Sequence, residues 1–309
     1  MRLTALILLA ATAARADLND LQLYLLGHPD PLACTRCDGL PGDTAEAGSP
    51  DAQPRFHRFA STLGLALAPP FQDTAGTLGQ SGFEVGLSSS QTFMQIPNDA
   101  WPTQRTQAIG TPPKVLVVPT LTLRKGLGGS LELGAAVGWL TNSQIVALSG
   151  ELRWALLDGM AYAPELALRA WGTRALGTQD LDLTVGGADV QLSKSFGVAG
   201  MMKLQPYGQF GMAFVNAVSS VVNFKPSVDN IRNPGAADGV FHNISFLKNR
   251  FYRGAVGLRL VAGAAVLALE GSVAAGTNPT QDDKLASGAA PPENFVRVWG
   301  AAARLGFFF

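Results

Sequence analysis

From position 82 onward, ten segments of the 309-residue chain alternate apolar and polar residues. Successive side chains of an extended strand point to opposite faces, so a period of two predicts a strand with one apolar face. In the last segment Trp299, Leu305 and Phe307 share one parity, whereas Arg304 has the other. The predicted strands cover residues 83–94, 114–125, 130–140, 145–157, 162–176, 181–196, 204–218, 251–263, 264–276 and 295–309.

The connections between these segments differ in length in a regular way. Each segment has at least the ~9–11 residues of a tilted membrane-spanning strand. Three connections are long, residues 95–113, 219–250 and 277–294, and all three are odd-numbered along the chain. Membrane barrels place short turns at one end and long loops at the other, whereas a soluble β-sandwich has no such parity. We therefore expect an all-β fold, a transmembrane antiparallel up-and-down β-barrel of about ten strands, or twelve if residues 59–68 join the sheet with one further segment.

The C-terminal segment ends on Phe309 after a stripe of alternate apolar residues. This ending resembles the last strand of bacterial outer-membrane β-barrel proteins. The resemblance extends over residues 82–309, rests on pattern and indicates no single family. It implies residence in the outer membrane, contact with outer-membrane lipid and lipopolysaccharide, and assembly by the barrel-assembly machinery through the C-terminal strand. It also implies either passive transport or a structural role.

The first 81 residues differ from the rest. Residues 1–16 combine an early arginine, a short apolar run and an Ala-Arg-Ala cleavage pattern, which predicts a secretory signal peptide. Residues 17–81 are broken by prolines and are expected to form an irregular periplasmic or plug-like segment. Within it, Leu18, Leu21 and Leu25 suggest one face of a short amphipathic helix. The barrel is assigned to residues 82–309, where no run of about 18 apolar residues indicates a transmembrane helix.

The charges of the chain are balanced. Its 23 Lys and Arg residues equal its 23 Asp and Glu residues, which argues against a nucleic-acid partner. Charged strand residues fall opposite the apolar stripe, a face that lines the lumen of a membrane barrel, whereas a soluble lipocalin-like barrel would turn its apolar stripe inward. The expected lumen network comprises Glu84, Glu132, Glu151, Glu165, Glu270, Arg153, Arg169, Arg253, Arg259 and Arg304.

Arginine suits such a network because its planar guanidinium pairs bidentately with carboxylates. Equal numbers of the two charges favour interlocked pairs, which either fill a narrow barrel or form the constriction of a small-solute pathway. Two places depart from simple alternation: Pro119 removes a ladder donor, and Gly186-Gly187 suggests a β-bulge where the apolar stripe changes parity. Aromatic residues expected at the membrane interfaces are Trp139, Trp154, Trp299, Phe307 and Phe309.

Other candidate sites lie outside the strands. Cys34 and Cys37 form a C-x-x-C pair, for which a disulfide is the default in an exported protein. The alternative is a zinc site completed by His28 and His57. His242 is the candidate residue for hydrolytic chemistry, which requires a partner within hydrogen-bond reach.

These features together favour a non-enzymatic protein without metal or cofactor. We expect a narrow pore or passive transporter of small solutes, or a structural barrel whose lumen is filled by the Arg/Glu network. The alternatives are a structural or adhesive protein that binds through its long outer loops, and an outer-membrane lipid hydrolase.

Overall fold

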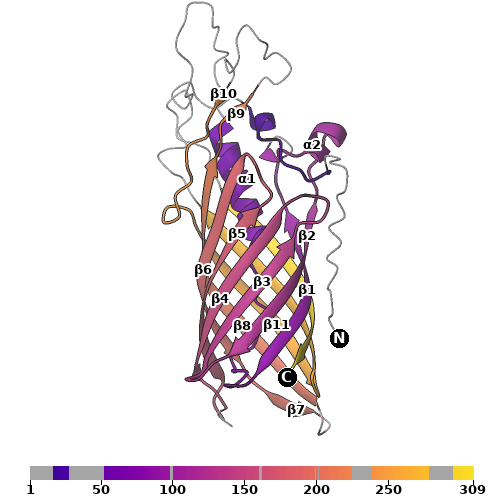
Figure 1. The fold of residues 1–309 in the computed structure, drawn as a ribbon, viewed down its shortest axis with the longest axis vertical. Coiled ribbons are helices and arrows are strands. Elements are labelled where there is room, and N and C mark those ends of the chain that lie inside the picture. The colour runs from indigo at the N-terminus through magenta and orange to yellow at the C-terminus, as the bar shows by residue number, and fades with distance from the viewer. Residues whose placement is uncertain are drawn as a thin grey trace, which may run out of the picture.

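The chain forms a closed β-barrel of ten strands, as the alternating segments predict (Figure 1). The computed structural model describes residues 17–27, 52–97, 100–159, 162–198, 200, 202–224, 238–277 and 295–309. The barrel strands are β1 (Phe83–Met94), β2 (Val115–Gly126), β3 (Leu131–Trp139), β4 (Val146–Leu157), β5 (Glu165–Leu176), β6 (Leu181–Ser193), β8 (Met202–Ser219), β11 (Arg250–Ala262), β12 (Ala265–Thr277) and β13 (Phe295–Phe308).

Few other elements accompany the barrel. The short strand β7 (Phe196–Val198) pairs with β8, and β9 (Val222–Asn223) pairs with β10 (Asp238–Gly239). The helical elements are the 3₁₀-helix η1 (Leu23–Leu26), α1 (Ala52–Leu67) and α2 (Gln104–Ile109). None of the helices in the described ranges is long and apolar enough to cross a bilayer.

All neighbouring barrel strands are antiparallel, and two pairings close the ring. β8 pairs with β11, and β13 pairs with β1 from Val298–Met94 to Phe308–Glu84. At the end of the second ladder, the N–H of Phe83 donates to the carbonyl of Phe309 (3.1 Å), and the N–H of Phe309 donates to the carbonyl of Phe83 (2.8 Å). The C-terminal phenylalanine therefore completes the barrel seam, and no strand edge faces lipid there.

The two ends of the barrel differ. At the end that we call the turn end, the connections 127–130, 158–164, 194–201 and 263–264 are short. At the opposite end, the loop end, lie α1, α2 and the β9–β10 hairpin (Figure 1). Barrels of the outer membrane keep short turns at the periplasmic side and longer loops outside, so the loop end is the outer one.

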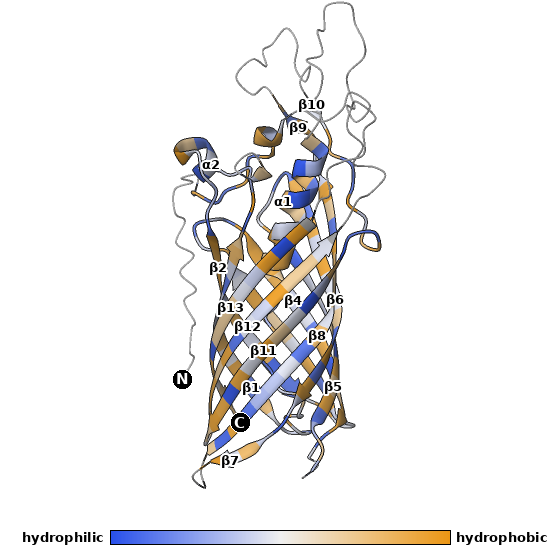
Figure 2. Cartoon of the chain, turned by 180° about the vertical axis from the view of Figure 1, so that it is seen from behind, coloured by the Kyte–Doolittle hydropathy of each residue, from blue (hydrophilic) through white to orange (hydrophobic). Residues whose placement is uncertain are grey.

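The outer surface of the barrel is apolar and its inner surface is not. On β4, Leu152 and Trp154 point outward and are 46% and 50% exposed, whereas Arg153 between them is buried. Figure 2 shows this alternation of hydrophobic and hydrophilic positions along the strands. The predicted interface aromatics are all about half exposed or more, with Trp139 and Trp299 towards the loop end and Trp154, Phe307 and Phe309 towards the turn end. This inverted arrangement is that of a membrane barrel.

The described N-terminal region is irregular outside its helical elements, as predicted, but it includes one long helix. Residues 52–67 form the helix α1, so the expectation that residues 59–68 add a strand is wrong. Phe56, Phe59, Leu63 and Leu67 recur at helical spacing, which overrides the short alternating run within them. The predicted helix with Leu18, Leu21 and Leu25 on one face is also wrong, because only Leu23–Leu26 form a short 3₁₀ turn, in which Leu23 and Leu26 are the buried side chains.

The two irregularities predicted in the strands resolve differently. No bulge occurs at Gly186-Gly187, since β6 keeps one register with both β5 and β8 through these residues. The inward positions of β6 keep one parity throughout, but they are apolar in the loop-end half of the strand and polar in the turn-end half. Pro119 lies one residue beyond the β2–β3 ladder, which ends at Thr120–Gly138, so its missing N–H interrupts no pairing on that side.

Candidate functional site in the barrel lumen

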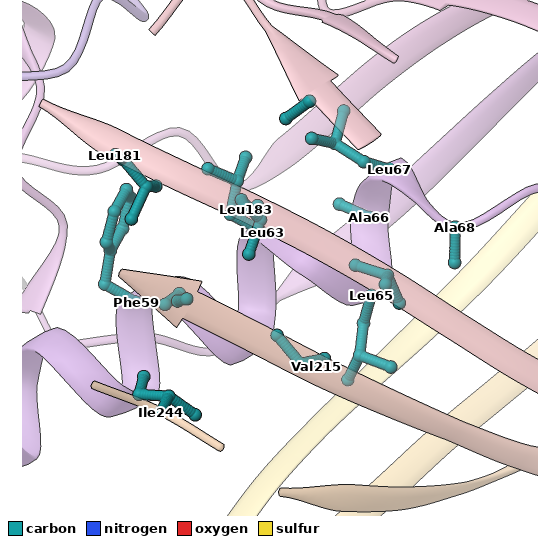
Figure 3. Packing of buried hydrophobic residues seen from close by; sticks show 14 of the residues in the cluster. Phe59, Leu63, Leu65, Ala66, Leu67, Ala68, Leu181, Leu183, Val215 and Ile244 are labelled. Carbon is teal, nitrogen blue, oxygen red and sulfur yellow. The ribbon is translucent and has the colours of Figure 1, made fainter. Parts of the chain in front are cut away.

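The loop-end half of the lumen is an apolar core built around α1. This helix contacts β1, β2, β6, β8 and β13, and therefore lies inside the ring of strands. Its residues Phe59, Leu63 and Leu65 pack with Leu183 of β6 and Val215 of β8 (Figure 3). At Gly64 the approach is closest, because a Cβ there would lie 3.0 Å from side-chain methyl carbons of both Val185 and Val215. The helix thus fills this half of the barrel.

Buried polar groups fix α1 to the connection between β8 and β11. The Nε2 atom of His57 lies 3.1 Å from Oδ1 of Asn249, and Nδ2 of Asn249 donates to Oγ of Ser61 (3.1 Å). At the start of the helix, the Gln53 side chain bonds both main-chain groups of His242 (2.9 and 3.1 Å). These contacts hold the helix in one position along the barrel axis.

An extended segment, residues 68–82, then crosses the lumen from the end of α1 to the start of β1. We call it the luminal segment. Barrel-wall side chains bind its main chain at ten groups over residues 69–78. Five main-chain carbonyls accept hydrogen bonds from the wall: that of Pro69 from Arg253, that of Pro70 from Arg169 and that of Asp73 from Gln209. The carbonyls of Thr74 and Gly76 both accept from Arg153. Five main-chain N–H groups donate in the other direction, and those of Phe71 and Gln72 both donate to Glu270. The N–H of Ala75 donates to Ser193, that of Thr77 to Asp158 and that of Leu78 to Glu132.

One side chain of the luminal segment joins the charges of the wall. The carboxylate of Asp73 pairs with Arg124 and lies 3.5 Å from Arg304. Glu84 of β1 binds three arginines, at 2.7 Å for Arg124, 2.9 Å for Arg259 and 2.6 Å for Arg304. Glu132 pairs with Arg153 and lies 3.7 Å from Arg124. We call this buried set the luminal charge cluster: Asp73, Glu84, Glu132, Arg124, Arg153, Arg259 and Arg304.

A second group of charges lies around Phe71. Arg169 pairs with Asp189 (2.7 Å) and Glu151 (3.4 Å), and its guanidinium lies 5.0 Å from the centre of the Phe71 ring. Arg253 stacks over the same ring at 4.3 Å and over Trp171 at 4.8 Å. Cation–π contacts of this kind stabilise a buried guanidinium. The aromatic ring of the luminal segment is thereby held between two wall arginines.

All ten predicted network residues lie on the inner face of the barrel, but not all form the predicted pairs. Glu165 binds the hydroxyls of Ser193 (2.7 Å) and Ser195 (3.2 Å). Glu270 binds main-chain N–H groups of the luminal segment and the hydroxyl of Tyr207 (3.1 Å). Both carboxylates accept hydrogen bonds from uncharged donors. The luminal segment and the neighbouring strands supply these N–H and O–H groups, where the sequence suggested arginine.

Three charged residues of the lumen were missed. Arg124 follows outward Leu123 and Asp189 precedes outward Val190, so both have the parity of inward positions and the pattern contained a signal for them. Asp73 belongs to a proline-rich stretch with no periodicity, and no local signal places it at the centre of a barrel.

Two cavities remain along the lumen. One of about 380 Å³ lies at the turn end, lined by Thr74, Arg153, Glu165, Lys203 and Arg259 among others. A second, of about 30 Å³, lies beside Asp73, Glu151 and Arg304, and has room for about two water molecules. The luminal segment thus lies between a small internal cavity and a charged vestibule at the turn end.

Several predicted features fall elsewhere. The signal peptide, Cys34, Cys37 and His28 lie outside the described residues. His57 is buried in α1, and the His242 side chain is exposed at the loop end. No group of three or more His, Cys, Asp or Glu residues with metal-binding geometry occurs in the part of the chain that the structure describes.

No family model matches the sequence, and no curated protein matches it. Solved structures with a similar fold include the outer-membrane protease OmpT of Escherichia coli, at 10% identity and a TM-score of 0.36, covering 74% of this chain and 96% of that one. LpxR of Salmonella typhimurium has 10% identity and a TM-score of 0.32, with coverage of 72% and 100%. The outer-membrane protein OprG of Pseudomonas aeruginosa has 11% identity and a TM-score of 0.28, with coverage of 77% and 99%.

Likeness at this level concerns the fold alone. The class of the protein follows from its own structure: ten antiparallel strands close into a ring, apolar side chains cover the outside, and the C-terminal phenylalanine completes the seam. The chain has the fold and the outward apolar surface of an outer-membrane β-barrel protein.

Proposed function

We propose that the protein is a sealed, non-enzymatic barrel with a structural or adhesive role, and that it conducts no solute in its resting state. The observation that carries this proposal is the wall-bound main chain of the luminal segment. An extended peptide has N–H and C=O groups that need partners when buried. Here wall side chains supply a partner at every residue from Pro69 to Leu78.

The strength of this attachment supports a sealed lumen. A hydrogen bond to a charged group contributes about 1.5–3 kcal/mol, and removing one partner of a buried ion pair costs about 3–5 kcal/mol. Displacing the luminal segment would break several such contacts at once and leave wall charges unpaired. The apolar packing of α1 above it adds to the barrier. Spontaneous opening is therefore expected to be rare.

Any binding by a sealed barrel must use its surface. At the loop end α2 and the β9–β10 hairpin extend past the strands (Figure 1), and Ile109 of α2 is 55% exposed. These outer elements are the proposed binding face. The apolar belt below them is proposed to contact outer-membrane lipid, and the C-terminal strand to be recognised during assembly.

A second candidate function is a narrow pore for small solutes. The 380 Å³ vestibule favours it, because this cavity carries charged side chains from the turn end as far as the luminal charge cluster. A pore would require the luminal segment to move. The two functions therefore differ in whether that segment leaves its place.

Planar-bilayer conductance of the full-length protein tests the choice. A matched lock is an Ala75→Cys/Ser193→Cys variant in a Cys34→Ser/Cys37→Ser background, because the N–H of Ala75 donates to Oγ of Ser193 (2.9 Å) and the two residues are therefore neighbours. Loss of free thiols shows that the disulfide has formed. A sealed barrel gives a flat trace whether the lock is oxidised or reduced. Discrete steps from wild-type protein that vanish on oxidation of the lock would overturn the proposal in favour of the pore.

A further inference from the structure

The start of the described chain is bound at the loop end of the barrel. The N–H of Asn19 donates to the carbonyl of Asn142 (2.8 Å), and the N–H of Gln144 donates to the Asp20 side chain (3.1 Å). The N–H of Arg105 donates to the carbonyl of Leu18 (2.8 Å). The partners belong to the connections between β1 and β2 and between β3 and β4. Residues 17–27 therefore sit on the connections that are odd-numbered along the chain.

The chain later reaches the opposite end through the inside of the barrel. α1 packs within the loop-end half, the luminal segment follows, and β1 begins at the turn end, where Phe83 pairs with Phe309. Figure 1 shows α1 near one end of the barrel and the C-terminus near the other. Residues 17–27 and the first residue of β1 thus lie at opposite ends of the barrel.

The orientation of the barrel in the membrane decides on which side of the membrane residues 17–27 lie. Proteins reach the outer membrane from the periplasm, and single-chain barrels keep their short turns on that side. All of the turn-end connections are short, whereas the long connections lie at the loop end. The turn end accordingly faces the periplasm, and residues 17–27 lie at the end of the barrel that faces away from the compartment in which the chain arrived.

We propose that the N-terminal region of the exported chain crosses the outer membrane inside its own barrel and remains at the cell surface, where residues 17–27 cap the barrel mouth. This goes beyond the sealed-barrel function, because it would hold equally for a pore. Two features of the sequence and the wall fit the passage. No Phe, Trp or Tyr occurs between Tyr24 and Phe56, so this stretch carries none of the bulky aromatic side chains. The wall also binds mainly main-chain groups, which every sequence presents.

Cysteine accessibility on intact cells tests the proposal. Three single-cysteine variants share a Cys34→Ser/Cys37→Ser background in the full-length chain. Leu18→Cys reports on the N-terminal region, Ile109→Cys on the loop end and Tyr162→Cys on the turn end, and all three positions are exposed. A membrane-impermeant maleimide is applied before and after the outer membrane is permeabilised, and heat-modifiability on gels confirms that each barrel is folded.

We expect Leu18→Cys to react on intact cells to the same extent as Ile109→Cys, whereas Tyr162→Cys reacts only after permeabilisation. Reaction of Leu18→Cys only after permeabilisation would overturn the proposal, whatever Ile109→Cys does. Reaction of Tyr162→Cys on intact cells, with Leu18→Cys and Ile109→Cys protected, would overturn it through reversed sidedness. None of these outcomes depends on conductance, so the sealed-barrel function is tested separately.

Discussion

Replacing Glu84 with Gln tests whether the luminal charge cluster stabilises the barrel. Glu84 is fully buried and binds Arg124, Arg259 and Arg304. The cluster has four arginines and three carboxylates, a net charge of +1, which becomes +2 in the variant. The side-chain volume hardly changes, so the effect isolates charge.

We expect this variant to lose about 3–5 kcal/mol of unfolding free energy, the usual cost of removing one partner from a buried ion pair. The control is Asp182→Asn, whose 2.7 Å pair with Arg174 has side chains 50% and 59% exposed. Exposed pairs contribute roughly 0–1 kcal/mol, so the control should unfold almost as the wild type does.

The measurement is urea unfolding of the refolded protein in lipid vesicles, followed by tryptophan fluorescence and analysed only where unfolding and refolding coincide. A Glu84→Gln curve that matches the Asp182→Asn curve would refute the reasoning. It would mean that water or a rearranged Asp73 compensates the lost charge, and that the cluster is not a set of interlocked pairs.

Three further substitutions test other parts of the fold, each by the same unfolding assay. Gly64→Val should destabilise by about 1–3 kcal/mol, because its side chain overlaps Val185 and Val215 against which α1 packs; an unchanged curve would mean that α1 can shift. Asn249→Ala should cost about 1–3 kcal/mol, since it removes the partner of the buried Ser61 hydroxyl, and a neutral result would contradict the role of this contact. Leu152→Arg should cost about 2–4 kcal/mol in lipid but much less in detergent, because this side chain faces the acyl chains.

The sequence predicts the barrel wall well because alternation is local. All ten barrel strands begin and end within about three residues of their predicted limits, and inward positions such as Glu84 and Arg169 follow from parity alone. The contents of the lumen are not predicted in this way. Residues 68–82 have no period, and their conformation is set by wall residues more than a hundred positions away, such as Glu270.

The helix α1 was missed for a related reason. Almost every residue from Ala52 to Leu67 is buried, including Gln53, His57 and Ser61, because the barrel surrounds the helix on all sides. A helix at a surface shows a polar face and an apolar face, and that contrast is what makes it recognisable. Here the polar residues are buried and bonded, so the helix lacks the exposed polar face that normally marks such a segment, although its apolar residues recur at helical spacing.

The inner face of β6 shows how the wall and its contents are matched. From the loop end it presents Leu181, Leu183 and Val185, and beyond Gly187 it presents Asp189 and Gln191. The change occurs where the chain inside passes from helix to extended segment. A helix satisfies its own main chain, so an apolar wall suffices beside it, whereas an extended segment needs wall side chains as hydrogen-bond partners.

This matching changes how a polar barrel interior should be interpreted. Charged residues that face a lumen are usually taken as the lining of a water path. In this protein Glu132, Arg153 and Glu270 bind main-chain groups of the luminal segment, so they act as ligands for a peptide. Arginines and carboxylates both serve this purpose, because carbonyls of the segment accept from arginines and its N–H groups donate to carboxylates. A neutral, mixed-charge interior is therefore evidence for a filled barrel as much as for a channel.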